Sequence, residues 1–167
     1  ALFDSMNIEE NIMFPLRMFS NKEKSEMLLR VNEVLERVDL KNINKKFPSE
    51  ISGGMKKRVS IARAIVNNPK YLFCDEPNSG LDPKTATLID QLIQEITREN
   101  NITTVVVTHD MNSVMEIGEK IVFLKNGKLF WQGSNLEIFK TDNKDVTDFV
   151  YSSDLFKKIR NIQLNEH

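Results

Sequence analysis

The sequence has one cysteine, Cys74, and no long run of apolar residues. A single cysteine cannot form a disulfide within the chain, which excludes a disulfide-stabilised scaffold and fits a reducing compartment. Because Cys74 lies in an apolar stretch, we expect a small buried residue there and not a reactive thiol. No apolar run approaches the ~18 residues that a membrane-spanning helix needs, and the chain does not begin with a signal peptide.

The chain also lacks a strong charge of either sign. Its formal net charge is -1, so there is no overall electrostatic argument for binding nucleic acid or an anionic membrane. With 167 residues, 40% hydrophobic and 28% charged, it has the composition of a globular protein with one real core. The first residue is Ala1, and we therefore expect a fragment whose upstream part is missing.

The first third of the sequence is expected to be mainly helical. Ser20 and Glu23 have the spacing of a capping box. Apolar residues then recur at helical spacing to a predicted end near Asp39, namely Met27, Leu28, Val31, Val34, Leu35 and Val38. A second helix is predicted at about 54–67, with Val59, Ala62, Ile65 and Val66 on one face.

After Pro69 the pattern changes to strands alternating with a helix. The runs "KYLFCDEP" and "ITTVVVTHD" are short and apolar, which predicts parallel strands buried on both faces. Between them, Asp82 and Pro83 begin a predicted helix, one side of which carries Leu88, Leu92, Ile93 and Ile96.

A different pattern follows the second strand. Asn126-Gly127 lies between two apolar runs and predicts a β-hairpin. Ser134 and Glu137 form a second capping box, and the tail from 145 to 160 is expected to be helical.

Ser52, Gly53 and Gly54 stand directly before the second predicted helix. Glycine is a poor helix former, so the pair favours a close approach of the backbone to another group. A helix N-terminus offers unpaired N–H groups and the positive end of the helix dipole, which suit an anion. The alternative is an ordinary N-cap at Ser52 followed by an ordinary turn.

Three polar side chains come at the carboxyl ends of the two predicted strands, where parallel sheets place ligands. Asp75 and Glu76 end the first strand, and a close acidic pair favours a bound Mg²⁺. Glu76 could polarise a water for attack, and His109, after the second strand, could hold a phosphate oxygen or orient that water. Alternatively, the acids form a solvated loop or helix cap and the histidine is structural.

Taken in order, these motifs resemble the ATPase domain of ABC transporters over residues 1 to about 140. "ISGGM" is similar to the signature loop, usually LSGGQ, and "YLFCDE" is similar to the Walker B strand with its catalytic glutamate. "SGLD" is similar to the loop usually written SALD, and His109 stands at the position of the switch histidine.

The resemblance implies a site shared between two subunits that bind two ATP molecules head to tail. Ser52, Gly53 and Gly54 would bind the γ-phosphate of ATP on the opposite subunit. Asp75, as the Mg²⁺ ligand, and the catalytic Glu76 and His109 would act on the chain's own nucleotide. Ser79 and Asp82 would belong to the loop that crosses the dimer interface.

Two departures from the family pattern matter. Met55 replaces the glutamine of the signature and cannot make its hydrogen bonds. No G-x-x-x-x-G-K-[ST] phosphate loop occurs in the sequence, and the glutamine-bearing loop and the adenine-stacking aromatic residue are missing too. We therefore expect that the chain alone neither binds ATP strongly nor hydrolyses it.

The expected fold class is α/β, a partial P-loop NTPase-like ABC ATPase domain. It would comprise a helical signature subdomain with a segment facing the membrane subunit (1–66), the later half of the parallel-sheet core with a terminal hairpin (67–139), and a helical tail (140–167). Without the phosphate-loop strand, sheet edges and apolar faces should be uncovered, leaving the chain marginally stable or sticky.

The segment "ALFDSMNIEENIMFPL" also resembles ATPase subunits of the Mla type, which serve phospholipid transporters of bacterial envelopes. This resemblance implies an ATP- and Mg²⁺-dependent subunit that couples hydrolysis to lipid transport. It would work as a homodimer bound to transmembrane permease subunits at the cytoplasmic face of the inner membrane. The same segment could instead simply pack the helical subdomain.

Two other functions stay open. A soluble ABC ATPase of DNA repair or translation would share the fold, although the long coiled coils or paired ATPase units usual there are absent from the sequence. A non-catalytic partner could offer Ser52, Gly53 and Gly54 in trans, although it would not need Asp75, Glu76 and His109. The C-terminal segment, with Phe149, Val150, Leu155, Phe156 and Ile159, packs on its own domain or contacts a neighbouring subunit.

Overall fold

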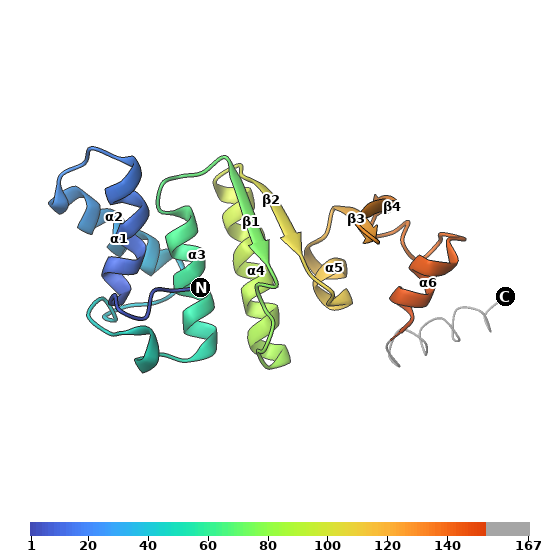
Figure 1. Ribbon diagram of the computed structural model, residues 1–167, viewed down its shortest axis with the longest axis horizontal. Helices are drawn as coiled ribbons and strands as arrows, with labels where there is room; N and C mark the ends of the chain where they lie inside the picture. Colours follow the sequence, from blue (N-terminus) through green and yellow to red (C-terminus); the bar gives the residue numbers. More distant parts are fainter. Residues whose placement is uncertain (153–167) are drawn as a thin grey trace. The chain divides into compact units, whose positions relative to one another are not determined.

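Helices dominate the first part of the chain, as predicted. The computed structural model describes residues 1–152 (Figure 1). Its first elements are α1 (Ile8–Phe19), α2 (Lys24–Arg37), the 3₁₀ turn η1 (Pro48–Glu50) and α3 (Gly53–Ile65). The first three α-helices pack against one another pairwise and share one hydrophobic core.

Helix α1 contains a proline, Pro15, in its interior. Proline removes a backbone donor and usually ends a helix. The helix persists because it has a complete capping box between Asn7 and Glu10 and a buried face. That face consists of Ile8, Asn11, Ile12, Met13 and Leu16.

The predicted capping box before α2 was wrong by three residues. The contact at the start of α2 is between Glu23 and Glu26: the N–H of Glu23, the N-cap, donates to the Glu26 carboxylate at 3.3 Å. Ser20 instead ends α1, where its hydroxyl donates to the carbonyl of Leu16 at 2.7 Å. The predicted apolar face is confirmed, since Val31, Val34, Leu35 and Val38 are all buried and Met27 and Leu28 pack beside them.

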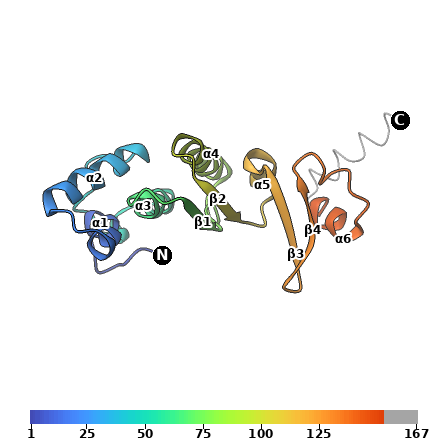
Figure 2. The same ribbon diagram turned by 90° about the horizontal axis from the view of Figure 1, so that it is seen from above.

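The two apolar runs form a parallel pair, β1 (Tyr71–Asp75) and β2 (Thr103–Val107), in which Phe73 lies opposite Val105. Burial on both faces was wrong. Leu72 is 3% exposed but its neighbour Phe73 is 74% exposed. Figure 2 shows the reason: α4 (Pro83–Glu99) covers one face of the sheet, and within residues 1–109 no helix covers the other. The expectation of an uncovered apolar face is confirmed.

Helix α4 begins as predicted, with Asp82 as N-cap and Pro83 in its first turn. The predicted apolar side was wrong at one position, because Leu88 is exposed and Ile89 takes its place in the core with Ile93 and Ile96. Leu92 is partly buried against the same core. A hydrogen bond of 2.6 Å between the hydroxyls of Thr97 and Thr104 ties α4 to β2.

The residues after His109 form a second compact unit with its own core. It contains α5 (Met111–Ile117), the antiparallel strands β3 (Lys120–Lys125) and β4 (Lys128–Ser134), and α6 (Lys144–Val150). The hairpin is confirmed: Asn126 and Gly127 have φ of 52° and 71°, as a type I′ turn requires. This division of the chain after residue 109 differs from the three segments predicted above. The roles given to those three segments as subdomains stay a prediction.

Two predictions near the end of the chain are met in part. Ser134 and Glu137 do form a capping box, with hydrogen bonds of 2.7 to 3.3 Å, but the residues after it make turns and not a helix. Of the predicted helical tail, α6 is present, and Phe149 and Val150 pack in the core of this unit. Leu155, Phe156 and Ile159 lie outside the described residues.

Candidate functional site

The N-terminus of α3 is built from Ser52 and the two glycines. Ser52 is the N-cap, and its hydroxyl accepts a hydrogen bond from the N–H of Met55 at 3.3 Å. A β-carbon on Gly54 would come within 2.9 Å of the Thr85 methyl group, so glycine is needed there for close approach. A β-carbon on Gly53 would meet Leu81 at an ordinary 3.6 Å. The N-cap is thus confirmed, and a phosphate-binding role for these residues stays a prediction.

Met55 follows the glycines and is the residue that departs from the family signature. It is partly buried and packs against the main hydrophobic core. The methionine side chain therefore serves the packing of α3, which accounts for an apolar residue where the family signature has a polar one.

Glu76 follows β1 in a backbone conformation that non-glycine residues rarely adopt, with φ of 46°. Such a conformation costs about 1–3 kcal/mol and persists where the surroundings hold it. Here the N–H of Glu76 donates to the carbonyl of Val107 on β2 at 2.9 Å. Its carbonyl accepts from the N–H of Ser79 at 3.3 Å and from the ammonium group of Lys57 at 2.8 Å.

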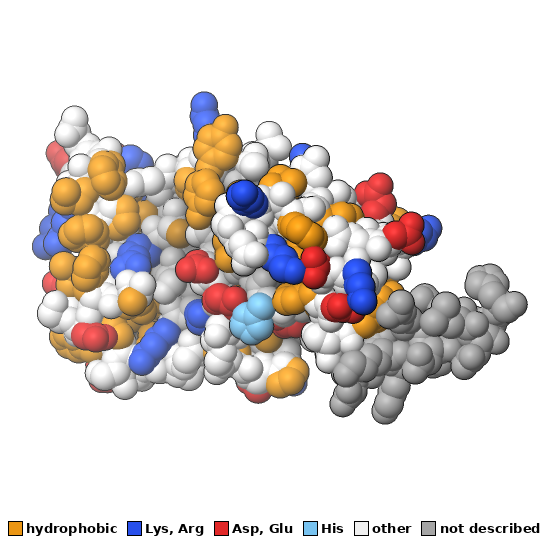
Figure 3. Space-filling model, turned by 45° about the vertical axis from the view of Figure 1, so that its right-hand side comes forward, with side chains coloured by type: hydrophobic (Ala, Val, Ile, Leu, Met, Phe, Trp, Pro, Cys, Tyr) orange, Lys and Arg blue, Asp and Glu red, His pale blue; other side chains and the backbone are white. Residues whose placement is uncertain are grey.

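The structure brings Glu76 and His109 together at the carboxyl ends of the two parallel strands. Nδ1 of His109 lies 2.7 Å from Oε1 of Glu76, and the two side chains are 77% and 34% exposed. An ionised carboxylate can only accept, so Nδ1 is the protonated nitrogen of this contact. The imidazole is at the surface beside acidic side chains (Figure 3). A carboxylate held by a histidine at a strand end can accept a proton from a water.

The loop between β1 and α4 carries Ser79 and Asp82. Asp82 accepts hydrogen bonds from the N–H of Thr85 at 3.0 Å and from its hydroxyl at 2.6 Å. These bonds, the hydroxyl foremost, hold the pKa of the Asp82 carboxyl below its ordinary value. Gly80 has φ of 77°, a left-handed conformation that favours glycine. Both predicted loop residues are exposed on this turn.

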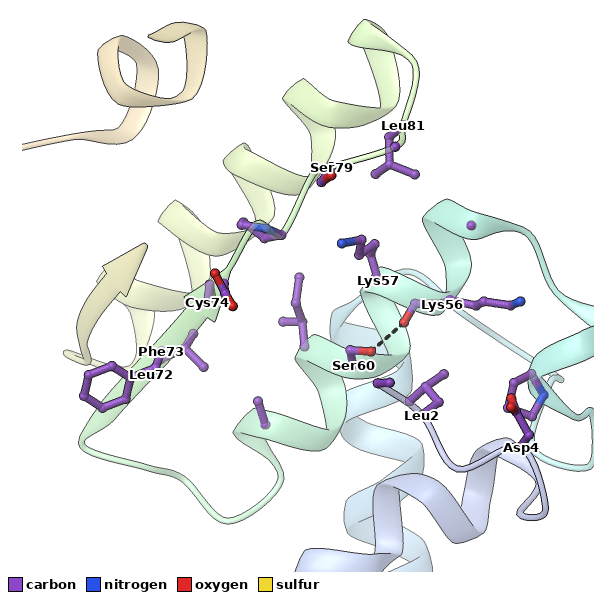
Figure 4. Close-up of a pocket in the computed structure, with 18 residues that line it drawn as sticks. Leu2, Asp4, Lys56, Lys57, Ser60, Leu72, Phe73, Cys74, Ser79 and Leu81 are labelled. Atoms are coloured by element: carbon purple, nitrogen blue, oxygen red, sulfur yellow. Dashed lines mark hydrogen bonds between the residues drawn. The ribbon is translucent and has the colours of Figure 1, made fainter. Parts of the chain in front are cut away.

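A cavity of about 610 Å³ lies between α3 and the β1 strand with its loop (Figure 4). Gly53, Asp75 and Ser79, which come from three separate sequence motifs, all line it. Cys74 lines it as well, and burial raises the pKa of its thiol to about 11, so it is not a reactive thiolate. Among residues 1–152, no hydrogen bond joins Ser52 to Asp75 or Glu76, although Gly53 and Asp75 line the same cavity.

Asp75 is the predicted metal ligand. It is exposed at the end of β1, and the described residues include no group of three or more metal-ligating side chains. Mg²⁺ in phosphate-transfer sites is held by one or two carboxylates together with waters and substrate phosphates. A single exposed carboxylate fits an ion that arrives with the nucleotide, and does not fit an ion caged by protein alone.

Lys57 was missed by sequence reasoning. Its ammonium group donates to the carbonyl of Glu76, 19 residues away on another element, and no local pattern indicates such a contact. Lys57 is half-buried, whereas the adjacent Lys56 is exposed. The sequence "MKKR" gives no reason to treat the two lysines differently.

Comparison with known proteins agrees with this architecture. Residues 1–79 match the family described as "ABC transporter". The dimeric, ADP- and phosphate-bound structure of the ATP-binding cassette MJ0796 matches with a TM-score of 0.71 and 34% identity, over 80% of this chain and 59% of that one. The predicted fold class, a partial ABC ATPase domain, is therefore confirmed.

Two curated relatives are named methionine import ATP-binding protein MetN. That of Bacillus subtilis is 41% identical over 86% of this chain and 42% of its own length. That of Campylobacter jejuni is 40% identical over 92% of this chain and 50% of its own length. The chain thus spans half or less of the length of these relatives.

The expected Mla-type, lipid-transport subfamily is not supported, because these relatives are named for methionine import. In the structure, residues 1–16 pack the helical core, which is the alternative given above for this segment. Asn11 is fully buried and bonds the backbone of Phe3, Met6 and Asn7, so this stretch is shaped by packing of the helical core.

No helix among residues 1–152 is long and apolar enough to cross a membrane.

Proposed function

Since the chain has the fold and the ordered motifs of part of an ABC transporter ATPase domain, we propose that it is part of an ATP-hydrolysing subunit that drives an importer. The observation that carries this proposal is the 2.7 Å contact of Glu76 with His109 at the ends of two neighbouring parallel strands. The sequence relatives favour methionine as the imported molecule.

In this proposal each predicted residue has a role. Glu76 accepts a proton from the attacking water, and His109 orients that carboxylate and contacts the phosphate side of the site. Ser52, Gly53 and Gly54 bind the γ-phosphate of ATP held by a second copy, with the α3 N-terminus as the anion site. Asp75 binds the Mg²⁺ that accompanies ATP, and this ion would neutralise charge on the phosphates.

Two features support action between two copies. Ser52 shares no hydrogen bond with Asp75 or Glu76 within the described part of this chain, and Ser52 and Asp75 are exposed while Glu76 is half-buried. Ser79 and Asp82 lie on an exposed turn beside the α3 N-terminus, where Gly53 faces Leu81. We assign this turn to a head-to-tail interface. The assembly would bind membrane permease subunits at the cytoplasmic face.

The test is ATP hydrolysis by the longest reading frame that contains this chain, purified as its native assembly. Glu76→Gln should lower kcat by roughly 10²–10⁴ and leave ATP binding largely intact, because the carboxylate acts as a base and not as a binding group. Glu99→Gln is the matched control, because Glu99 lies at the far end of α4 and pairs with Arg37. This variant should leave kcat and ATP binding unchanged. Loss of hydrolysis and binding to the same extent would contradict the role of Glu76.

The imported molecule is tested separately. Cells that lack the gene should take up less labelled methionine, and the wild-type gene should restore uptake while the Glu76→Gln gene should not. Uptake of labelled leucine through other systems serves as the control. Unchanged methionine uptake in the deletion strain would reject methionine and leave the ATPase assignment standing.

A further inference from the structure

Lys57 and Lys56 are neighbours on the first turns of α3 but point in different directions. Figure 4 shows Lys57 reaching towards the loop after β1, while Lys56 extends away from it. The Lys57 ammonium group donates to the Glu76 carbonyl at 2.8 Å. The Lys56 side chain makes no hydrogen bond or ion pair within the part of the chain that the structure describes; only its backbone carbonyl accepts, from Ser60.

Lys57 bonds the backbone carbonyl of Glu76, the part of this residue that the rest of the chain supports least. Glu76 has a left-handed backbone with φ of 46°, which an unsupported chain would leave. Its N–H is fixed on β2 through Val107, and its side chain contacts His109 at 2.7 Å. On the carbonyl side, the turn supplies only one N–H, from Ser79, at a long 3.3 Å. The ammonium group is the closer and the charged donor, and hydrogen bonds from charged donors are the stronger kind.

We propose that Lys57 is a positioning residue that holds Glu76 in its strained backbone conformation and so aims the Glu76 carboxylate at His109. Lys57 lies one turn after Gly53, so the same helix start carries the predicted phosphate-binding N-terminus and the support of the catalytic carboxylate. A shift of α3 when phosphate binds there would reach Glu76 through this contact. This inference rests on the proposed ATPase function and goes beyond it by assigning a residue outside the family motifs.

The first experiment needs no catalysis. Lys57→Met keeps most of the side chain length and removes the donor, and Lys56→Met is the matched control. In the longest reading frame that contains this chain, the imidazole signals of His109 are followed by NMR and identified by their loss in His109→Gln. Lys57→Met should shift or broaden these signals, and Lys56→Met should leave them in place. Equal spectra for the two variants would overturn the proposal. Urea unfolding verifies that both variants are folded.

The second experiment measures steady-state ATP hydrolysis by the native assembly of the longest reading frame. Lys57→Met should lower kcat by about 10- to 100-fold, the cost expected for a misplaced catalytic group, with KM unchanged because Lys57 contacts no substrate. Lys57→Arg, which can still donate, should recover part of kcat. A raised KM with normal kcat, or the same kcat for both methionine variants, would overturn the positioning role.

The two experiments separate failure of this inference from failure of the proposed function. An unmutated assembly that hydrolyses no ATP would reject the ATPase assignment, and with it the catalytic consequence of Lys57. The NMR comparison would still decide whether Lys57 holds Glu76 against His109, because it reads that contact directly.

Discussion

The methyl group of Thr85 lies 2.9 Å from the position that a β-carbon on Gly54 would occupy. Thr85 cannot turn this methyl group away without losing its 2.6 Å hydrogen bond to Asp82. The start of α3 and the start of α4 are therefore fitted to each other through a glycine that has no side chain.

This fit predicts different effects of alanine on stability at the two glycines. Gly54→Ala should destabilise the chain by about 1–3 kcal/mol, the usual cost of overpacking. Gly53→Ala, with an ordinary 3.6 Å contact, should be neutral or slightly stabilising, because alanine is the better helix former. Adding Thr85→Ser, which removes the methyl group and keeps the hydroxyl, should rescue Gly54→Ala. Urea unfolding measures all three, and failure of the rescue would contradict the clash.

A second prediction concerns Asn11, which is fully buried and satisfies four backbone groups. Asn11→Ala leaves the N–H of Phe3 and the carbonyl of Met6 without this partner, at about 1–3 kcal/mol for each one that water cannot reach, whereas the carbonyls of Phe3 and Asn7 keep a backbone hydrogen bond. The exposed Asn67, with one bond to the carbonyl of Pro15, is the control, and Asn67→Ala should change stability by less than about 0.5 kcal/mol. Similar unfolding midpoints for the two variants would contradict this account of residues 1–16.

The exposed sheet face gives a third prediction. Phe73 and Leu72 are neighbours on opposite faces of β1, 74% and 3% exposed. Leu72→Ala should cost about 2–5 kcal/mol, whereas Phe73→Ala should have little effect on stability. Phe73→Ala should also reduce self-association and binding of a hydrophobic dye, because Tyr71, Val105 and Val107 share its apolar face. Light scattering and dye fluorescence measure this, and unchanged association would show that the face is not the sticky surface.

Asp82 gives a prediction about pH. Its pKa is lowered in the folded chain, chiefly by the Thr85 hydroxyl. Its carboxylate therefore stabilises the fold at pH values above its pKa in the unfolded chain, about 3.9. That stabilisation is lost as the pH falls through the lower pKa that Asp82 has in the folded chain. At pH 7, the wild-type chain should therefore unfold at a higher urea concentration than Asp82→Ala. This gap between the two urea midpoints should close in strong acid. Thr85→Val should narrow the gap at pH 7, and a gap that does not change with pH would contradict this assignment.

The last prediction treats Glu76 and His109 as one unit. In the native assembly, His109→Ala should lower kcat because Glu76 loses the partner that orients it. The double variant with Glu76→Gln should be no slower than Glu76→Gln alone, since groups that act together are strongly non-additive. Independent, multiplying losses would show that the two side chains act separately.

Several features could be read from neighbouring residues alone. The Asp82–Pro83 helix start, the Asn126–Gly127 turn and the Ser52 N-cap are local, because each depends on residues within one turn. The order of the four motifs was enough to recognise the ABC ATPase fold. The Mla-type expectation is not supported by the relatives, and in the structure the first residues of the chain pack the helical core.

Other features needed the chain to be folded. The α1 helix continues through Pro15, because its buried face compensates for the backbone hydrogen bond that proline cannot make. The strands were expected to be buried on both faces because apolar runs are alike whether or not another element covers them. The choice of Ile89 over Leu88 for the core likewise depends on how α4 rests on the sheet.

By itself, the sequence determined which residue types stand at the ends of the two strands and at the start of α3, since these follow from motif and spacing. Only the tertiary structure decided which of them meet. Glu76 and His109 are 33 residues apart and touch because parallel strands align their carboxyl ends. Lys57 supports Glu76, and Lys56 does not, because the rotation of α3 about its axis is set by the core on its other side.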